Sequence, residues 1–504
     1  MVAIRAEARA QRAVSEAAIP LENPTPALHR RALSLGVVNA TNYAVQFLLP
    51  VVLARFLLPD AFGEYRLIWL VISTAIIFVP MEMHGVLYYF LPRVGAAEQR
   101  LYVHQTSLYL TLMGAIAALA VSPLNPWLPE SIRDLGASAD LLPALVFFYA
   151  VTMLLDTLPT IEERIRWQAV VTLSISLLRA VVLAAAAWLT GDLQLMLWLM
   201  LAILLIKGGI QLVYVARHHG LGGPWFGWRQ FREQLIHAAP LGFAGALYQL
   251  RSQSDQWVAA SLFSLGNFAA FSIAAVISPL VNLCRQSVNN VFLPSMSRLD
   301  AADNFAGAVR LNGSANVMVS MLAYPMLTFA FVFAEDLISL VFTSSYVAAA
   351  PAMRIYSLGM LILLVELSSL TLLHRDGAFA LRINVLLVLA SLGLSWLAAQ
   401  KFGLAGAAVG STVSLYLDRW LTLRRIAQRS GIPVRQLQDW PKLGRMLGAV
   451  TAAGAMAWLI GCVAPVDGTA SRLLLGGVLL VGFYGAFLRL TGDLPTMAKP
   501  EIDY

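Results

Sequence analysis

Charged residues of opposite sign lie close together in the apolar segment 246–263, ALYQLRSQSDQWVAASLF. Arg251 and Asp255 are four residues apart, and a helix would place them on one face with Tyr248 and Ser252. A guanidinium is permanently charged and binds carboxylate or phosphate oxygens through paired N–H groups. A carboxylate one turn away either neutralises that charge or releases it on protonation. The segment therefore predicts a buried anion site, with Asp255 as the neutralising or switching partner of Arg251.

Composition determines the surroundings of this face. Of the 504 residues, 59% are hydrophobic and 12% are charged, and the mean hydropathy is +0.71. Soluble domains contain roughly 45–50% apolar and 25% charged residues, so the chain is predicted to be an all-α polytopic membrane protein. Basic cytoplasmic loops explain the net charge of +7, and no nucleic-acid partner is expected.

About fourteen segments are long and apolar enough to cross a hydrocarbon core roughly 30 Å thick. Their predicted limits are 33–57, 66–91, 102–123, 141–158, 168–189, 193–215, 236–262, 266–293, 315–334, 350–373, 379–400, 404–423, 443–464 and 472–491. When the N-terminus is placed inside, most of the 35 Lys and Arg residues fall in cytoplasmic segments. Both termini are therefore predicted to be cytoplasmic, and the spans are expected to contact membrane lipids.

An internal repeat relates two halves of six spans each. At an offset of 206, Phe62 falls on Phe268 and Tyr65 on Phe271, which aligns the start of the chain's first span with that of its seventh. Because six is even, the halves run in the same sense, and their pseudo-two-fold axis stands along the membrane normal. The predicted parts are a cytoplasmic tail (1–31), an N-lobe (32–218), a cytoplasmic linker (219–235), a C-lobe (236–425) and a basic loop with two extra helices and a tail (426–504).

The first hairpin, VVLARFLLPDAFGEYRLIWLVIS (51–73), resembles the corresponding segment of the polysaccharide transporter and oligosaccharidyl-lipid flippase family of the MOP (MATE-like) superfamily. The residues that carry the pattern are Ala54, Arg55, Pro59, Phe62, Gly63 and Tyr65. Residues 237–263, 334–359 and 403–418 resemble further family segments. The resemblance implies a flippase of the bacterial inner membrane for an undecaprenyl-diphosphate-linked oligosaccharide, in exopolysaccharide or O-antigen export. It also implies a polysaccharide polymerase as a partner.

Polar stripes on the predicted spans support a central cavity. The eighth span carries one stripe at helical spacing: Ser278, Asn282, Arg285, Gln286, Asn289 and Asn290. The first span carries Asn39, Asn42 and Gln46, and the offset of 206 sets Asn42 and Gln46 against Tyr248 and Ser252. A charge at the bilayer centre costs about 2.5–3.5 kcal/mol, so these faces are expected to meet water or protein. Hydrogen bonding between helices is the alternative to a shared cavity.

Buried arginines in such a cavity suit an anionic diphosphate, and nearby amides suit its oxygens or sugar hydroxyls. The predicted substrate-binding residues are Arg251, Arg285, Asn282, Gln286, Asn289, Asn290, Asn42, Gln46 and Arg179. For Arg179, pairing with Asp156 is the alternative. A MATE-type cation-coupled antiporter is one competing function, against which the central arginines and two extra spans count. A membrane glycan polymerase or ligase is the other, against which the short external connections count.

Other features point away from catalysis and toward coupling or packing. Cys284 and Cys462 lie in apolar segments, and the sequence lacks phosphate-loop, metalloprotease and nucleophile-elbow motifs, so no enzyme activity, cofactor or metal is expected. The candidates for H+ or Na+ coupling are Asp255, Glu82 and Glu366, with structural carboxyls as the alternative. Lys207 is expected to reach the interface. Helix packing is expected of Asp418, Arg419, Gly406 and Gly410.

Overall fold

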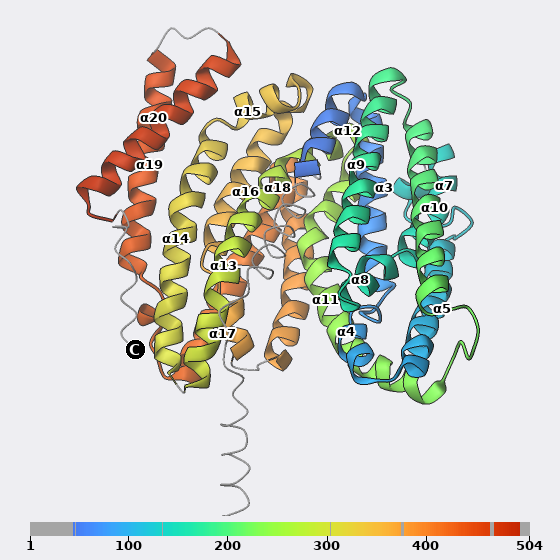
Figure 1. Ribbon diagram of the computed structural model, residues 1–504. Helices are drawn as coiled ribbons and strands as arrows, with labels where there is room; N and C mark the ends of the chain where they lie inside the picture. The colour runs from blue at the N-terminus through green and yellow to red at the C-terminus, as the bar shows by residue number, and fades with distance from the viewer. Residues whose placement is uncertain are drawn as a thin grey trace, which may run out of the picture.

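The computed structural model describes residues 44–45, 47–133, 135–302, 304–373, 377–463 and 468–493, which form helices and connections without any strand (Figure 1). The helices of the first half are α3 (Pro59–Phe78), α4 (Leu87–Phe90), α5 (Ala96–Ala120), α6 (Glu130–Arg133), α7 (Ala137–Val151), α8 (Leu154–Ile161), α9 (Ile165–Leu189) and α10 (Leu193–His218). Those that follow are α11 (Trp228–Leu262), α12 (Leu265–Ala274), α13 (Ser278–Ala301), α14 (Phe305–Val332), α15 (Ala334–Val341), α16 (Ala350–Leu363), α17 (Ser368–Leu373), α18 (Gly377–Ser430), α19 (Trp440–Val463) and α20 (Thr469–Leu490).

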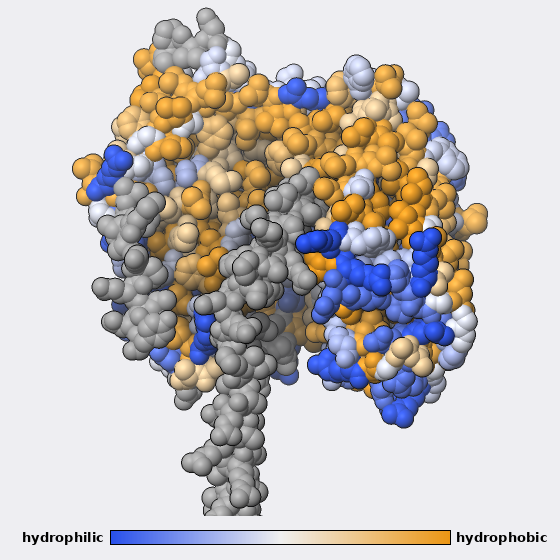
Figure 2. All heavy atoms as spheres, in the orientation of Figure 1, coloured by the Kyte–Doolittle hydropathy of each residue, from blue (hydrophilic) through white to orange (hydrophobic). Residues whose placement is uncertain are grey.

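The chain is a multi-pass membrane protein. Within the described residues, eleven helices are long and apolar enough to cross a membrane, and most of the surface seen in Figure 2 is hydrophobic. The eleven do not include α11, whose polar residues lower its hydropathy although it has 35 residues. They count α18 once, although the chain turns inside it at Gly403 (φ 60°). The count of fourteen spans stays a prediction.

The two limbs of α18 pack closely, as the glycine spacing predicted. A Cβ atom at Gly406 would lie 2.0 Å from the Ala398 carbonyl oxygen, and one at Gly410 would lie 2.2 Å from the Ser395 nitrogen. Any larger side chain would therefore push the limbs apart. The prediction of close helix contact at Gly406 and Gly410 is confirmed.

Two bundles lie side by side, with α3–α10 in one and most of the later helices in the other (Figure 1). Where they meet, α3 packs against α12, the helix that the predicted repeat sets against it. A Cβ atom at Gly63 would lie 2.0 Å from the Leu265 carbonyl oxygen, and one at Gly266 would lie 2.8 Å from an Asp60 carboxylate oxygen. The repeat pair Phe62 and Phe268 is fully buried. The outermost pair of helices, α19 and α20, packs on α14.

Several predicted spans are interrupted. The predicted helix at 66–91 ends at Phe78, and the following turn contains Met81 (φ 40°) and Glu82 (φ 61°). Gly242 of α11 allows this turn to approach, since a Cβ atom there would lie 2.4 Å from the Met81 carbonyl carbon. The predicted span 350–373 is also broken, between α16 and α17. In addition, α11 begins at Trp228, within the predicted linker 219–235.

Candidate functional site

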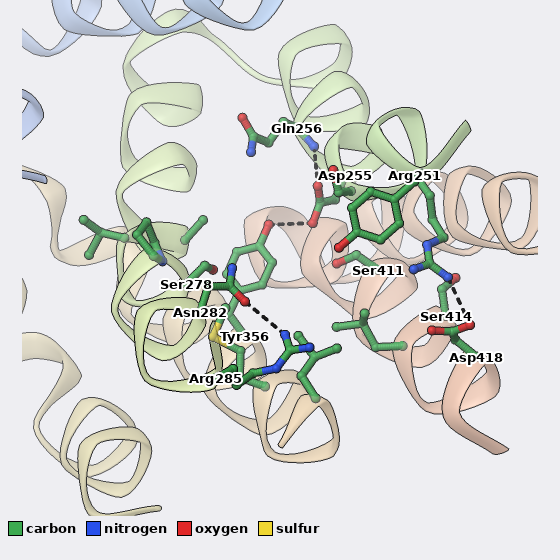
Figure 3. A pocket seen from close by; sticks show the side chains of 18 of the residues that line it. Arg251, Asp255, Gln256, Ser278, Asn282, Arg285, Tyr356, Ser411, Ser414 and Asp418 are labelled. Carbon is green, nitrogen blue, oxygen red and sulfur yellow. Dashed lines mark hydrogen bonds and ion pairs between the residues drawn. The ribbon is translucent and has the colours of Figure 1, made fainter. Parts of the chain in front are cut away.

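A cavity of about 980 Å³ lies between the two bundles. Its walls come from α3, α11, α12, α13, α16 and α18, together with residues of the helix at Phe47–Phe56. Figure 3 shows that the polar side chains of α11, α13, α16 and α18 point toward one another inside it. Tyr248, Arg251, Ser252 and Asp255 all line the cavity, so the polar face predicted for the seventh span borders it.

Arg251 and Asp255 have different partners from those predicted. Arg251 Nη1 lies 3.4 Å from an Asp418 carboxylate oxygen of α18 (Figure 3). Asp255 instead accepts hydrogen bonds from the Tyr356 hydroxyl at 2.7 Å and from the Gln256 backbone N–H at 2.8 Å. The expected neutralisation of Arg251 by Asp255 was therefore wrong, because a residue from another helix reaches the guanidinium and a tyrosine reaches the carboxylate.

Arg285 belongs to the same ion cluster at the cavity wall as Arg251 and Asp418. Its guanidinium pairs with Glu366 and donates to Asn282 Oδ1 at 3.0 Å. Arg419 Nη2 lies 3.8 Å from the same Glu366 carboxylate, and Arg419 Nη1 lies 3.9 Å from Asp418. A chain of alternating charges thus runs from Arg251 through Asp418, Arg419 and Glu366 to Arg285. Asp418 and Arg419, which were expected to serve helix packing, link the two arginines that were predicted to bind substrate.

The turn that carries Glu366 is held by buried amide side chains. Asn312 Nδ2 donates to the Glu366 carbonyl at 2.9 Å, and Asn316 donates to that carbonyl and accepts from the Glu366 N–H, both at 3.2 Å. Asn316 also donates to Gln438 Oε1 at 2.9 Å. Gln438 belongs to the connection before α19. Backbone groups left free by a broken helix need such partners inside a membrane, so the carboxylate has a fixed position.

Arg66 of α3 was missed by the sequence analysis. It lines the cavity from the N-lobe side, and its Nε has no hydrogen-bond partner among the described residues. The predicted second span began at residue 66, which made this arginine look like a boundary residue. Since α3 begins at Pro59, Arg66 lies about two turns inside the helix. The recognisable signal was Pro59, a residue favoured in the first turn of a helix.

The four cavity arginines share unsatisfied hydrogen-bonding capacity. Within the described part of the chain, one buried nitrogen of each lacks a hydrogen-bond partner: Nε of Arg66, Arg285 and Arg419, and Nη1 of Arg251, which makes only the 3.4 Å ion contact with Asp418. Buried polar groups are normally paired. Against these four guanidinium groups stand three carboxylates, those of Asp255, Asp418 and Glu366. The cavity therefore has an excess positive charge and donors suited to an anion with several oxygens.

The remaining predicted binding residues divide into three groups. Asn282 and Arg285 line the cavity, whereas Gln286 and Asn289, farther along α13, are not among its lining residues. Asn39, Asn42, Gln46 and the Asn290 side chain lie outside the described residues. The polar stripe of α13 is thus longer than the cavity wall to which it contributes.

Arg179 and Lys207 lie in the N-lobe, and neither lines the cavity. Arg179 donates to the Tyr149 hydroxyl at 3.2 Å, and its guanidinium lies 5.6 Å from the centre of the Trp69 ring. Asp156, the alternative partner of Arg179, instead accepts from Lys207 Nζ at 2.7 Å. Lys207 was expected to reach the interface, but this ion pair holds it within the lobe.

Of the predicted coupling residues, only Asp255 lines the cavity. Glu366 lies behind the wall, between Arg285 and Arg419. Glu82 lies in the turn after α3, and a Cβ atom at Gly85 would touch its carboxylate. No group of three or more potential metal ligands occurs in the described ranges. The arginines at the cavity wall give the site a geometry suited to holding an anion.

Comparisons with known proteins identify the family and the fold of the chain. A family model described as "Polysaccharide biosynthesis protein" matches residues 52–351, more than half of the chain. The capsular polysaccharide biosynthesis protein CapF of Staphylococcus aureus is 26% identical over 193 residues, which cover 37% of this chain and 48% of CapF. The match thus spans about half the length of that relative.

Two solved structures show the same fold. The lipid II flippase MurJ in an inward closed conformation aligns with a TM-score of 0.70 and 12% identity, covering 90% of this chain and 99% of MurJ. An inward-facing multidrug resistance MATE family transporter of the MOP superfamily aligns with a TM-score of 0.58 and 12% identity, covering 78% and 96% of the two chains. At these identities the likeness concerns the fold alone, which this chain shares with both proteins.

Proposed function

The chain belongs to the polysaccharide biosynthesis protein family, and we propose that it is a flippase for a lipid-linked oligosaccharide. The cargo would carry a diphosphate between its polyprenyl tail and its sugars, as undecaprenyl-diphosphate glycans do. Its export would supply an exopolysaccharide or O-antigen. The protein would act in the bacterial inner membrane with both termini cytoplasmic, and a polysaccharide polymerase would use the exported unit.

One observation carries this proposal: four arginines line one cavity between the two bundles, and three of them have a buried Nε without a hydrogen-bond partner among the described residues. A diphosphate has enough oxygens to accept from several guanidinium groups at once. Arg66 approaches from the N-lobe, whereas Arg251, Arg285 and Arg419 approach from the C-lobe. A diphosphate that bridges the lobes would stabilise the closed arrangement, and its release would allow the lobes to separate at the opposite face, as alternating access requires.

Asp255 is the residue that we assign to H+ or Na+ coupling. It lies in the cavity, is 2% exposed and accepts a hydrogen bond from Tyr356. Among the described residues, no arginine pairs with it, so its charge is free to respond to a cation. Glu366, by contrast, is held by two arginines. Glu82 remains a coupling candidate only through movement of the turn after α3.

The proposal is tested by reconstituting the protein in vesicles with a fluorescent lipid-diphosphate oligosaccharide. Transbilayer movement should fall by roughly tenfold to a hundredfold in Arg251→Ala and in Arg285→Ala, since a hydrogen bond to a charged group contributes about 1.5–3 kcal/mol. The matched control is Arg354→Ala, which removes an arginine paired with Glu335 outside the cavity. It should leave movement unchanged.

Three outcomes would contradict the proposal. Undiminished movement in both cavity variants would reject the site. Glycan polymerisation without transbilayer movement would support the enzyme alternative. Ion-driven export of organic cations, with no movement of the labelled lipid, would support a MATE-type antiporter.

A further inference from the structure

A second candidate site lies in the N-lobe, where α9 begins and α10 ends. We propose that this groove binds a membrane phospholipid with a negatively charged headgroup. Its phosphate would lie between Arg164 and Arg217, and an acyl chain would lie along α10. None of the residues that line the groove lines the central cavity, so this site is separate from the proposed flippase site.

The groove has one cationic and one apolar end. Its volume is about 420 Å³. Arg164, Arg217 and His218 line one end, and α10 residues such as Ile206, Ile210 and Val213 line the other. This arrangement follows from α10 leaving the apolar part of its span at its basic last turn. A phospholipid matches this arrangement, because its charged headgroup is followed by an apolar acyl chain.

Gly209 keeps the apolar end open. A Cβ atom at this position would have no neighbour within 4 Å, so a larger side chain would extend into free space rather than into the protein core. The adjacent α9 is very apolar, and only 11% of an 18-residue apolar window within it is buried, which places its surface against lipid hydrocarbon. An acyl chain can therefore reach the groove directly from the bilayer.

A network of hydrogen bonds and ion pairs connects the residues of the cationic end. Glu162 accepts hydrogen bonds from the Tyr214 hydroxyl and from His219 Nε2, the latter at 2.6 Å, and Arg164 Nε lies 3.7 Å from it. His218 Nδ1 donates to the Tyr214 carbonyl at 2.9 Å, and its Nε2 contacts Arg164 Nη1. This network holds Arg164 at the mouth of the groove before any ligand arrives.

Aromatic rings continue this network toward the groove. The Trp167 ring centre lies 4.8 Å from that of Tyr214, which lies 4.3 Å from the centre of His218. Tryptophan and tyrosine favour the headgroup level of a bilayer. The rings therefore fit the boundary between a lipid phosphate and its acyl chains.

The positive charge of the groove determines which class of lipid it would bind. No carboxylate is among the residues that line the groove, and Glu162 beside it already has three partners. A zwitterionic headgroup would bring its own ammonium group close to the two arginines, whereas phosphatidylglycerol brings only the negative charge. Basic pockets between membrane helices are suited to such headgroups.

Native mass spectrometry of the detergent-purified full chain with equal amounts of dioleoyl-phosphatidylglycerol and dioleoyl-phosphatidylcholine tests this inference. The wild type should retain phosphatidylglycerol preferentially. Arg217→Gln should lower that retention about fivefold, the equivalent of roughly 1 kcal/mol per basic residue near anionic lipid. Gly209→Leu fills the apolar end without changing charge and should lower retention by a similar factor. Arg166→Gln, an exposed arginine outside the groove, is the matched control and should retain the lipid like the wild type.

Equal retention of the two lipids by the wild type would overturn the proposal. So would unchanged retention in Gly209→Leu and Arg217→Gln, or an equal loss in the Arg166→Gln control, because binding would then follow net charge alone. Gly209→Leu decides the result if Arg217→Gln fails to fold. The lipid-diphosphate transport assay is independent of this measurement, so either hypothesis can fail alone.

Discussion

The fourth predicted span of each half is broken, and the two breaks are built alike. In the N-lobe, α7 ends at Val151 and α8 begins at Leu154. Gln211 of α10 accepts from the Leu155 N–H at 2.9 Å and donates to the Val151 carbonyl at 2.7 Å. In the C-lobe, Asn312 and Asn316 of α14 serve the Glu366 turn in the same way. Each half thus satisfies freed backbone groups with buried amides from a neighbouring helix.

The carboxylates beside the two breaks differ in their surroundings. Asp156 pairs with Lys207, and its side chain is 49% exposed. Glu366 is 4% exposed and lies between Arg285 and Arg419, which line the central cavity. Both Lys207 and Arg419 come from the sixth predicted span of their half. The same element therefore forms a local ion pair in the N-lobe and part of the proposed anion site in the C-lobe.

Removal of the two carboxylates should give the largest difference in stability between the two lobes. Glu366→Ala leaves Arg285 and Arg419 buried without their shared partner, and breaking a buried pair costs about 3–5 kcal/mol. Asp156→Ala removes a partner whose side chain is 49% exposed, so a smaller loss, below about 1 kcal/mol, is expected. Chemical unfolding in detergent measures both free energies. Equal losses would show that the breaks are energetically equivalent and that the comparison is wrong.

This contrast shows what the sequence allowed us to predict. Apolar length, basic loops and the 206-residue repeat predicted the all-helical membrane fold, and helical spacing selected Arg251, Asn282 and Arg285, which line the cavity. The partners could not be predicted, because Arg251–Asp418 and Asp255–Tyr356 join helices far apart in the chain. Spacing within one helix instead suggested the wrong pair, Arg251 with Asp255.

Helix breaks were a second limit on prediction. Hydropathy shows whether about twenty residues can cross a bilayer, but not whether their helix is continuous. The turn at Met81 and Glu82 and the Glu366 turn are apolar enough to resemble helix interior. Their backbone is satisfied by distant amides such as Asn316, whose role appears only in three dimensions.

Replacement of the amide residues at the two breaks should give the next largest effect. Asn316→Leu and Gln211→Leu each leave a buried backbone N–H unpaired, which should cost about 1–3 kcal/mol of unfolding free energy in either lobe. Transport should separate them. Asn316→Leu releases the Glu366 turn and should slow lipid movement roughly tenfold, equivalent to about 1.4 kcal/mol. Gln211→Leu should change movement less than about twofold after correction for the folded fraction. Equal slowing would mean that both breaks belong to the transport machinery.

A smaller effect is expected at Gln438, which connects the Glu366 turn to the segment before α19. Gln438→Leu removes the acceptor of one Asn316 hydrogen bond but also removes a buried Nε2 that has no partner in the described structure. These effects oppose each other, so the change in stability should stay below about 1 kcal/mol. Slower lipid movement at unchanged stability would show that the helices beyond the repeat position the anion site. Movement equal to that of the wild type would confine them to another role.

The smallest effect on stability should come from protonation of Glu162, which directly follows α8 and lies outside the membrane spans. Burial opposes ionisation of Glu162, but hydrogen bonds from His219 and Tyr214 and the charge of Arg164 outweigh it and lower its pKa below the ordinary 4.5. Its contribution to stability is therefore complete above the unfolded-state pKa and is lost as the pH falls through the folded-state pKa. Thermal unfolding between pH 7 and about pH 3.5 should show a shallower acid loss in Glu162→Gln than in the wild type or in the exposed neighbour variant Glu163→Gln. An identical loss of thermal stability in acid for all three proteins would exclude Glu162 as the source of that loss. A transport defect in Glu162→Gln at neutral pH would give the N-lobe ion pairs a role beyond local stability.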